Sequence, residues 1–346
     1  MSTTRRHLHN LLLRMRVEFR KKYCLHPDAP KACSTHIISA HSVQRAMLEK
    51  YVAVDGHVMQ YSVEPLLDPV TGIWVRPRRR GINQATTFFG FCHKHDAELF
   101  RPLETTNFTF EPEQIALLGY RAICHDSYPK DAAIDAMDAA RFYVMMHPDI
   151  GGFTEKDAAY QIKRLGMLNA RKNFARARSV FAEMIAKRNF SDLRFFGLQF
   201  DAPPMYLASS MLLPEWDFNG RNLQDLSTLD DFYPICFSAW AADGLSAAVF
   251  CWHVSADHVC RPFIDSLRET RPRRLANRIL SMIFEYSSNI VFRSDWWDAV
   301  PERYQRSLAN RVMSGVDDDF SRTARSLLDD GVRALKSTVA AKHASY

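Results

Sequence analysis

Cysteine and histidine residues gather in one stretch of the chain, between Tyr23 and Glu104. The stretch contains Cys24, Cys33, Cys92, His26, His36, His41, His93 and His95. Thiolate and imidazole groups are the usual zinc ligands in proteins. Seven widely spread cysteines, an odd number, favour metal binding and buried thiols over a disulfide framework. We therefore expect a metal to organise this stretch, and the later Cys124, Cys236 and Cys251 to be core thiols.

The local pattern divides these residues into two groups. Prolines make the segment 24–33 turn-rich, and a helix is expected after it, to about Tyr51. Asp55-Gly56 between β-forming residues then predicts a hairpin. β-rich segments are expected at 72–75 and 85–91, with an exposed basic loop at 76–81 between them. A helix is expected at 95–100. Cys92 and His95 consequently lie where a strand gives way to a helix.

This order of elements resembles the treble-clef zinc fold. The resemblance implies that Cys24 and Cys33 are knuckle ligands, and that Cys92 and His95 are ligands from the helix start. A closed Cys3His site of this kind would hold a structural Zn²⁺, whose binding contributes to folding. Residues 25–32 separate the first pair, a longer gap than the usual spacing of about two to four residues. His26 or His36 is therefore an alternative ligand.

The stretch also resembles the HNH nuclease family through Cys33-Ser34-Thr35-His36-Ile37-Ile38-Ser39. The resemblance implies that His36 is the general base, and that Mg²⁺ or Mn²⁺ would complete the site. The candidate catalytic and metal-site residues are His36, His41, His93 and Asp96. The sequence departs from the family at Thr35, where a metal-binding acid is usual. It also lacks an asparagine just before Cys92, and Asp96 replaces the final histidine.

Basic residues are concentrated near the beginning of the chain. Residues 1–22 carry a net charge of +6, equal to that of all 346 residues. Their apolar residues, from Leu8 to Phe19, recur at helical spacing, so we expect a helix that packs on the metal module. Such a basic arm attracts nucleic acid or an acidic partner, although a solvated helix face has the same pattern. The candidate nucleic-acid contacts are Arg5, Arg6, Arg76, Arg78, Arg79, Arg80, Arg164, Arg171 and Arg178.

The remaining periodicity predicts an α+β fold. It would comprise an N-terminal zinc-bound treble-clef-like module, a central helical region and a small C-terminal antiparallel sheet with helices. Pro129 is expected to restart a helix that stops before Pro148, and Thr154 with Asp157 to cap the next one. The expected units are a basic helix at 1–22, the zinc module at 23–110, the helical region at 111–190 and the α+β domain at 191–346. Strands are expected at 193–200, 205–213, 232–240, 247–254 and 289–293, and helices at 258–269, 272–288, 295–313 and 318–342.

Further polar clusters in the C-terminal region are weaker indications of a site. The loop 214–226 offers acids and amides, but the same residues favour turns. His253, His258 and Cys260 suggest a second metal cluster only weakly, and a core histidine fits better. Of Trp296 and Trp297, we expect one ring to pack and the other to be half exposed.

Several classes of protein lack support in the sequence. It contains no phosphate-cradling glycine loop, Ser-His-Asp motif or dinucleotide fingerprint. Its apolar runs are too short for a bilayer, and no signal peptide is evident, so we expect a cytoplasmic protein. The favoured interpretation is a zinc-stabilised protein that binds nucleic acid or a partner protein, such as a bacterial accessory or defence factor. The alternatives are an HNH-like metal-dependent nuclease and a protein that recognises a ligand or another protein through its C-terminal domain.

Overall fold

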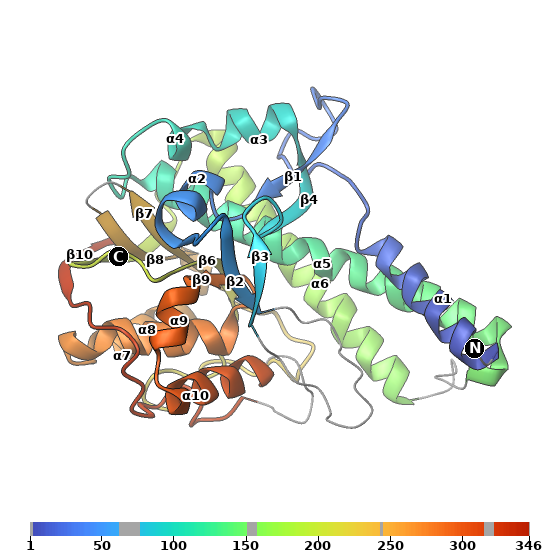
Figure 1. Ribbon diagram of the computed structural model, residues 1–346. Coiled ribbons are helices and arrows are strands. Elements are labelled where there is room, and N and C mark those ends of the chain that lie inside the picture. The colour runs from blue at the N-terminus through green and yellow to red at the C-terminus, as the bar shows by residue number, and fades with distance from the viewer. Residues whose placement is uncertain (1–2, 62–76, 151–157, 243–244, 315–321, 346) are drawn as a thin grey trace.

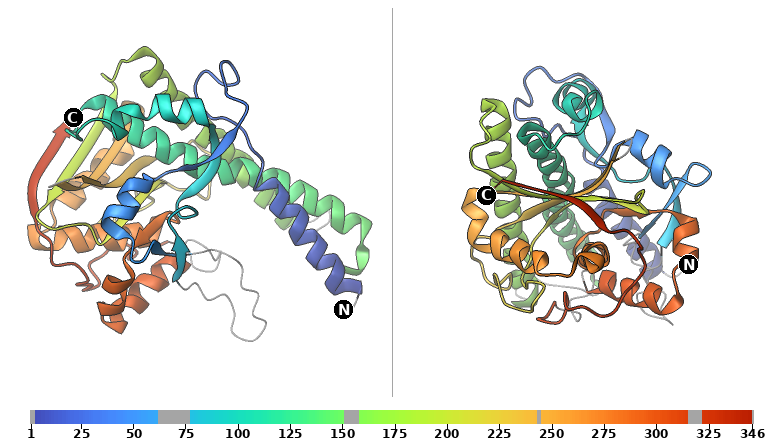
Figure 2. Two further views of the ribbon diagram at one scale, coloured as in Figure 1. Left: turned by 45° about the horizontal axis from the view of Figure 1, so that its top comes forward. Right: turned by 90° about the vertical axis from the view of Figure 1, so that its left-hand side faces the viewer.

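A large antiparallel sheet lies at the centre of the molecule, with helices on both faces (Figures 1 and 2). The computed structural model describes residues 3–61, 77–150, 158–242, 245–314 and 322–345. The α+β class expected from the sequence is confirmed. Within the described residues, helices long enough to span a bilayer are too polar to do so.

The helices and strands follow the chain with short connections. The strands are β1 (Ile37–His41), β2 (His57–Tyr61), β3 (Pro77–Gly81), β4 (Thr87–Cys92), β5 (Leu193–Phe200), β6 (Tyr206–Leu212), β7 (Ile235–Ala242), β8 (Leu245–His253), β9 (Ile290–Phe292) and β10 (Val339–Ser345). The helices are α1 (Thr3–Glu18), α2 (Arg45–Met47), α3 (His93–Leu99), α4 (Arg101–Glu104), α5 (Pro112–Met146), α6 (Ala158–Lys187), α7 (Asp257–Arg268), α8 (Pro272–Tyr286), α9 (Ser294–Ala299) and α10 (Glu302–Met313). Short 3-10 or π turns occupy Leu48–Val52, Pro148–Ile150 and Val254–Ala256.

The main sheet has eight strands in the order β10-β5-β8-β7-β6-β9-β2-β3. It is larger than the small C-terminal sheet that we expected, because β2 and β3 join it from the N-terminal stretch. The junction is the pairing of β2 with β9, which places Met59 opposite Phe292. A segment assigned to the zinc module by sequence thus shares a sheet with the C-terminal region.

Both faces of the sheet are buried along its central strands. One face packs on α5 and α6 through residues such as Met211, Trp240 and Val249. The other face packs on α7 and α8 through residues such as Phe237 and Phe250. All seven residues of β6 are consequently buried, which explains why this strand reads as an apolar run without alternation.

The basic helix α1 does not pack on the metal module as predicted. It lies along the outer half of α5, where that helix extends beyond the sheet (Figure 1). Arg14 stacks over the ring of Tyr143, and His7 bonds to Asp149. Leu8 and Leu12 remain exposed, because α5 offers a partner surface to only one side of α1.

Three further expectations are corrected by the structure. Pro129 lies inside α5, which continues through it, since buried residues on both sides hold the helix together. Residues 77–81 form the edge strand β3 and not a loop, because they pair with β2. Val300 and Pro301 divide the helix expected at 295–313 into α9 and α10.

The end of the chain departs most from expectation. A helix was predicted at 318–342, but residues 322–338 are irregular and β10 follows. β10 pairs with β5, and this tertiary pairing outweighs the helix preference of its alanines. The β-rich segment 72–75 and the capping pair Thr154 and Asp157 lie outside the described residues.

Candidate metal centre

Three cysteines and one histidine converge at the start of α3. The ligand atoms of Cys24, Cys33, Cys92 and His95 all lie within 4.8 Å of one another. Nδ1 of His95 is 3.4 Å from Sγ of Cys24 and 3.5 Å from Sγ of Cys33. A tetrahedral ion with Zn–S near 2.3 Å and Zn–N near 2.0 Å requires S···N separations of about 3.5 Å. The group is therefore compatible with a structural metal ion such as zinc.

The end of β4 positions two of these ligands. Cys92 is the N-cap of α3, and its thiol accepts a hydrogen bond from the backbone N–H of His95 at 3.5 Å. The intervening single turn brings the imidazole back over the thiol, as the Cys-x-x-His spacing predicts. His95 is almost completely buried.

A second segment brings Cys24 alongside β4. Tyr23 and Leu25 donate backbone hydrogen bonds to the carbonyls of Phe89 and Gly90. A Cβ at position 90 would collide with the ring of Phe88 and press on Leu25, so glycine permits this close approach. Cys33 completes the group from the turn before β1.

The thiols of the centre differ in acidity. Burial raises the pKa of Cys92, but hydrogen bonds from the His95 N–H and from Ser34 outweigh it and bring the pKa to about 7. Burial raises the pKa of Cys24 to about 11. Because a metal binds thiolate, occupation of the centre would release the proton of Cys24.

Neither alternative ligand lies in the group. The ring of His26 stacks on that of His95, with centroids 3.9 Å apart, and its Nδ1 accepts a hydrogen bond from the backbone of Asp28. His36 is exposed, and its carbonyl accepts a hydrogen bond from the backbone of His93. His26 thus supports the ligand His95 from outside, while His36 joins β1 to α3 through its backbone.

The residues named for nuclease chemistry do not form a second cluster in the described part of the chain. Nε2 of His41 lies 2.9 Å from the carbonyl oxygen of Ile82, which fixes the connection between β3 and β4. Asp96 is partly buried, and its pKa is raised by burial, with Arg121 acting in the opposite direction. No group of three or more metal-ligating side chains in the described ranges includes His36, His41 or Asp96.

The arginines proposed for nucleic-acid binding have different environments. Arg164 pairs with Asp138 and Arg178 with Asp131, so these two join α6 to α5. Arg171 is partly buried on α6, Arg6 is exposed on α1, and Arg5 belongs to the same helix. Arg76 lies outside the described residues. Arg78, Arg79 and Arg80 are exposed in succession on β3.

The other sequence-derived candidates have structural roles. Asp217 is buried and its carboxylate accepts hydrogen bonds from the backbone of Asn219 and Arg221, as expected of a turn. Nδ1 of His253 bonds to Ser255, while Cys260 is buried in the core. Cys124, Cys236 and Cys251 are buried, as expected.

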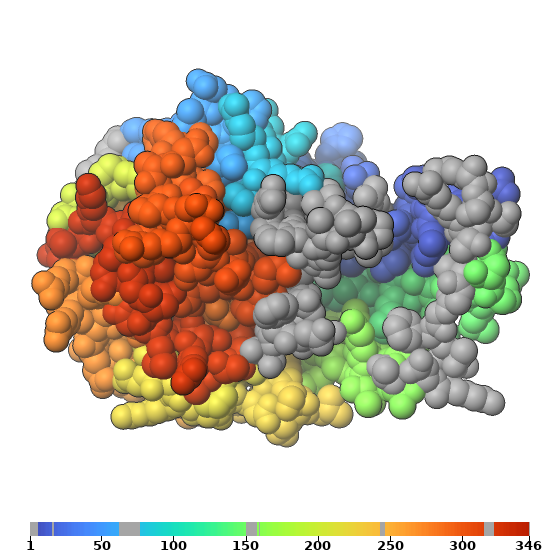
Figure 3. Space-filling view, turned by 60° about the horizontal axis from the view of Figure 1, so that its bottom comes forward, coloured from blue at the N-terminus to red at the C-terminus, as the bar shows by residue number. Residues whose placement is uncertain are grey.

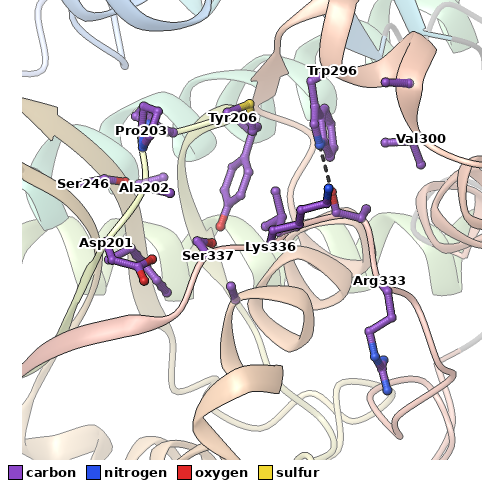
Figure 4. Close-up of a pocket in the computed structure, with 18 of the residues that line it drawn as sticks. Asp201, Ala202, Pro203, Tyr206, Ser246, Trp296, Val300, Arg333, Lys336 and Ser337 are labelled. Atoms are coloured by element: carbon purple, nitrogen blue, oxygen red, sulfur yellow. Dashed lines mark hydrogen bonds between the residues drawn. The ribbon is translucent and has the colours of Figure 1, made fainter.

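Trp296 borders a cavity of about 690 Å³, whose lining does not include Trp297. Trp297 is buried, whereas Trp296 is half-buried and its indole Nε1 donates a hydrogen bond to the carbonyl of Ala334 (Figure 4). The hydroxyl of Tyr206 points across the same cavity toward Ser337 (Figure 4). The packing of one ring and the partial exposure of the other are confirmed.

Sequence reasoning overlooked a group of arginines at the start of α8. Arg271, Arg273, Arg274 and Arg278 line one hollow of the surface together with Arg333. The available signal was local: the first turn of α8 contains arginines and no acid, whereas acids are the residues that stabilise a helix start.

No protein family, characterised protein or solved structure shows a significant match to this chain.

Proposed function

We propose that the protein binds nucleic acid through β3, and that a structural Zn²⁺ in the Cys3His centre holds this strand in place. The observation that carries the proposal is the run of three exposed arginines, Arg78, Arg79 and Arg80, on a strand at the end of the sheet order. Guanidinium groups bind phosphate oxygens through planar, charge-assisted hydrogen bonds.

A short series of contacts links the metal centre to these arginines. Cys92 ends β4, which pairs with β1 from Ile37 to His41. His41 bonds to the carbonyl of Ile82, the residue that follows β3. The metal would therefore fix β1 and β4, and through His41 it would fix the end of the arginine strand. In this proposal the ligand pairs Cys24/Cys33 and Cys92/His95 act as in a treble clef.

The surroundings of β3 favour contact with a phosphate backbone. A hollow of about 420 Å³ is lined by the three arginines and by His57, Gln60 and Gln84. These side chains are polar and hydrogen-bonding, and the lining contains no Phe, Tyr or Trp ring on which a base could stack. We therefore expect affinity that depends strongly on salt and weakly on base sequence.

The proposal is tested with the variant Arg78→Ala/Arg79→Ala/Arg80→Ala. Binding to labelled single-stranded and duplex DNA and RNA would be measured by fluorescence anisotropy at several salt concentrations. Each lost phosphate contact lowers the slope of log K against log salt by up to about one, so we expect a decrease of about two to three.

A matched control removes the same charge elsewhere. The variant Arg303→Ala/Arg306→Ala/Arg325→Ala replaces three exposed arginines on and after α10. It should retain the wild-type slope to within about one unit. Equal losses in the two variants, or absence of binding by the wild type to every oligomer, would overturn the nucleic-acid proposal. Elemental analysis tests zinc separately, since the purified chain should contain one zinc ion.

A further inference from the structure

A second polar centre, only partly buried, lies at the N-terminus of α8, in the C-terminal part of the chain. Its walls come from residues near 218, from 266–278 and from 328–333. Segments of these colours, yellow, orange and red, meet on the face shown in Figure 3. They enclose a hollow of about 790 Å³, within the size range of small-molecule sites.

The charge of this helix start is opposite to the usual arrangement. The N-terminus of a helix carries a partial positive charge and is stabilised by acidic groups. Arg271 is the N-cap residue of α8 and makes no side-chain capping hydrogen bond, and the first turn contains no acid. Arg273 and Arg274 follow at once. This arrangement of positive charges becomes favourable when an anion binds at the helix start.

Two of the arginines are buried and have unused donors. Arg274 is 7% exposed and Arg278 is 8% exposed, and both line the hollow. Arg274 pairs with Asp329 through Nη2, while its Nε and Nη1 have no hydrogen-bond partner among the described residues. Arg278 donates from Nη2 to the carbonyl of Phe218 at 2.7 Å, and its Nε likewise lacks a partner in the described ranges. Buried donors without acceptors are unfavourable unless a ligand supplies the acceptor.

The acids near the hollow do not neutralise it. Five arginines line it, with Glu269 and Asp329 as the acidic lining residues. Glu269 accepts a hydrogen bond from Asn219, and Asp329 is shared between Arg274 and Arg333. Arg333 lines both this hollow and the neighbouring cavity, and its side chain extends away from Tyr206 and Trp296 (Figure 4). An excess of positive charge thus remains around the unused donors.

We propose that this arginine pocket binds the phosphoryl group of a small phosphorylated molecule. A phosphoryl group carries up to two negative charges and three acceptor oxygens, and it fits the guanidinium fork in a bidentate manner. A carboxylate offers one charge to the same five arginines. Nucleic acid is the less suitable ligand, because Arg274 and Arg278 lie below the surface on which a strand would rest. The pocket shares no residue with β3, so this proposal does not depend on nucleic-acid binding.

Isothermal titration calorimetry on the full-length, zinc-loaded protein tests the proposal. The probes are inorganic phosphate, pyrophosphate and tripolyphosphate, with sodium chloride at matched ionic strength and a 20-nucleotide DNA as comparisons. We expect saturable binding of one tripolyphosphate per chain. The variant Arg271→Gln/Arg273→Gln alters two exposed side chains and should weaken that binding about tenfold or more, as expected for lost charge-assisted contacts.

Two further variants separate a built site from general attraction. Arg303→Gln/Arg306→Gln removes the same charge from α10 and should leave the affinity within about twofold of wild type. Arg278→Lys retains the charge but loses the fork, and should weaken binding several-fold. No heat with any phosphate probe would overturn the proposal. Equal losses in the two glutamine variants, or binding of the oligonucleotide but not of tripolyphosphate, would also overturn it.

Discussion

The Cys3His centre and the arginine pocket are both groups of polar side chains that include buried members, and they differ in the space that each group surrounds. In the Cys3His centre, four ligand atoms face one another within 4.8 Å, a space that fits a single ion. In the arginine pocket, five arginines line a hollow of about 790 Å³. The first would be completed by a cation and the second by an anion.

This difference separates a structural centre from a binding site. A closed tetrahedral group leaves no coordination position for a substrate, so its metal would contribute to folding. An open group with unused donors contributes little to folding and is completed only when a ligand arrives. Under the two proposals, the N-terminal centre would contribute stability and the C-terminal pocket would recognise a small molecule.

The largest effect is expected from removal of a metal ligand. Cys92→Ala deletes the thiol that caps α3 and removes one of the four candidate metal ligands. Without a bound metal, the free-energy cost of burying the remaining polar ligand groups is no longer offset. We expect the free energy of unfolding to fall by at least about 3 kcal/mol. Urea denaturation followed by circular dichroism, with zinc content from elemental analysis, measures both changes.

A buried thiol outside the centre provides the control for this variant. Cys124→Ala should retain full zinc content and lose about 1 kcal/mol, because it removes one small core group. If Cys92→Ala kept its zinc, or lost no more stability than Cys124→Ala, the structural role of the centre would be wrong.

A smaller loss of stability is expected from a variant at the start of α7, which, unlike the start of α8, contains an acid. Asp257 lies in the first turn of α7, where its carboxylate accepts hydrogen bonds from Trp252 Nε1 at 2.7 Å and from Arg261. Burial raises the pKa of Asp257, but these hydrogen bonds outweigh it and hold the pKa below its usual 3.8. Asp257→Asn removes the charge, and should cost about 1 kcal/mol at pH 7.

The pH dependence of this loss has a definite sign. Because the pKa of Asp257 is lower in the folded protein, its carboxylate stabilises the fold above pH 3.8. That contribution disappears as the pH falls from 3.8 through the folded pKa. Urea denaturation of wild type and variant at pH 7, 5 and 3 should therefore show a difference that shrinks only at the lowest pH. A difference independent of pH would mean that the charge is unimportant.

Much of the fold could be predicted from sequence where local pattern and tertiary structure agree. The strands β5 to β8 and the helices α7 and α8 occupy the expected segments. The failures come from contacts that are distant in sequence. β10 is rich in alanine and becomes a strand because the edge of β5 is available, and β3 becomes a strand because β2 pairs with it.

The two polar centres differ in the same way. Cys92 and His95 are separated by one helical turn, so their convergence could be predicted from spacing. The arginine pocket joins the start of α8 to Asp329 and Arg333, which lie in the irregular segment 322–338, where the sequence predicted a helix. Only the absence of an acid in the first turn of α8 was visible in advance.

The smallest change in stability is expected from Arg271, and it tests whether the arginines at the start of α8 destabilise the protein when no ligand is bound. Arg271→Asp would place a good capping residue at the N-cap position and a negative charge at the helix start. We expect the free energy of unfolding to rise by about 0.5–1 kcal/mol in phosphate-free buffer, while tripolyphosphate binding weakens by tenfold or more. Arg271→Ala removes the positive charge without adding a cap, and should weaken binding less and give a smaller gain in stability. Chemical denaturation and calorimetry of the two variants separate these contributions. A loss of stability in Arg271→Asp without ligand would show that the arginine already has a partner in the folded chain, and that α8 is not held ready for an anion.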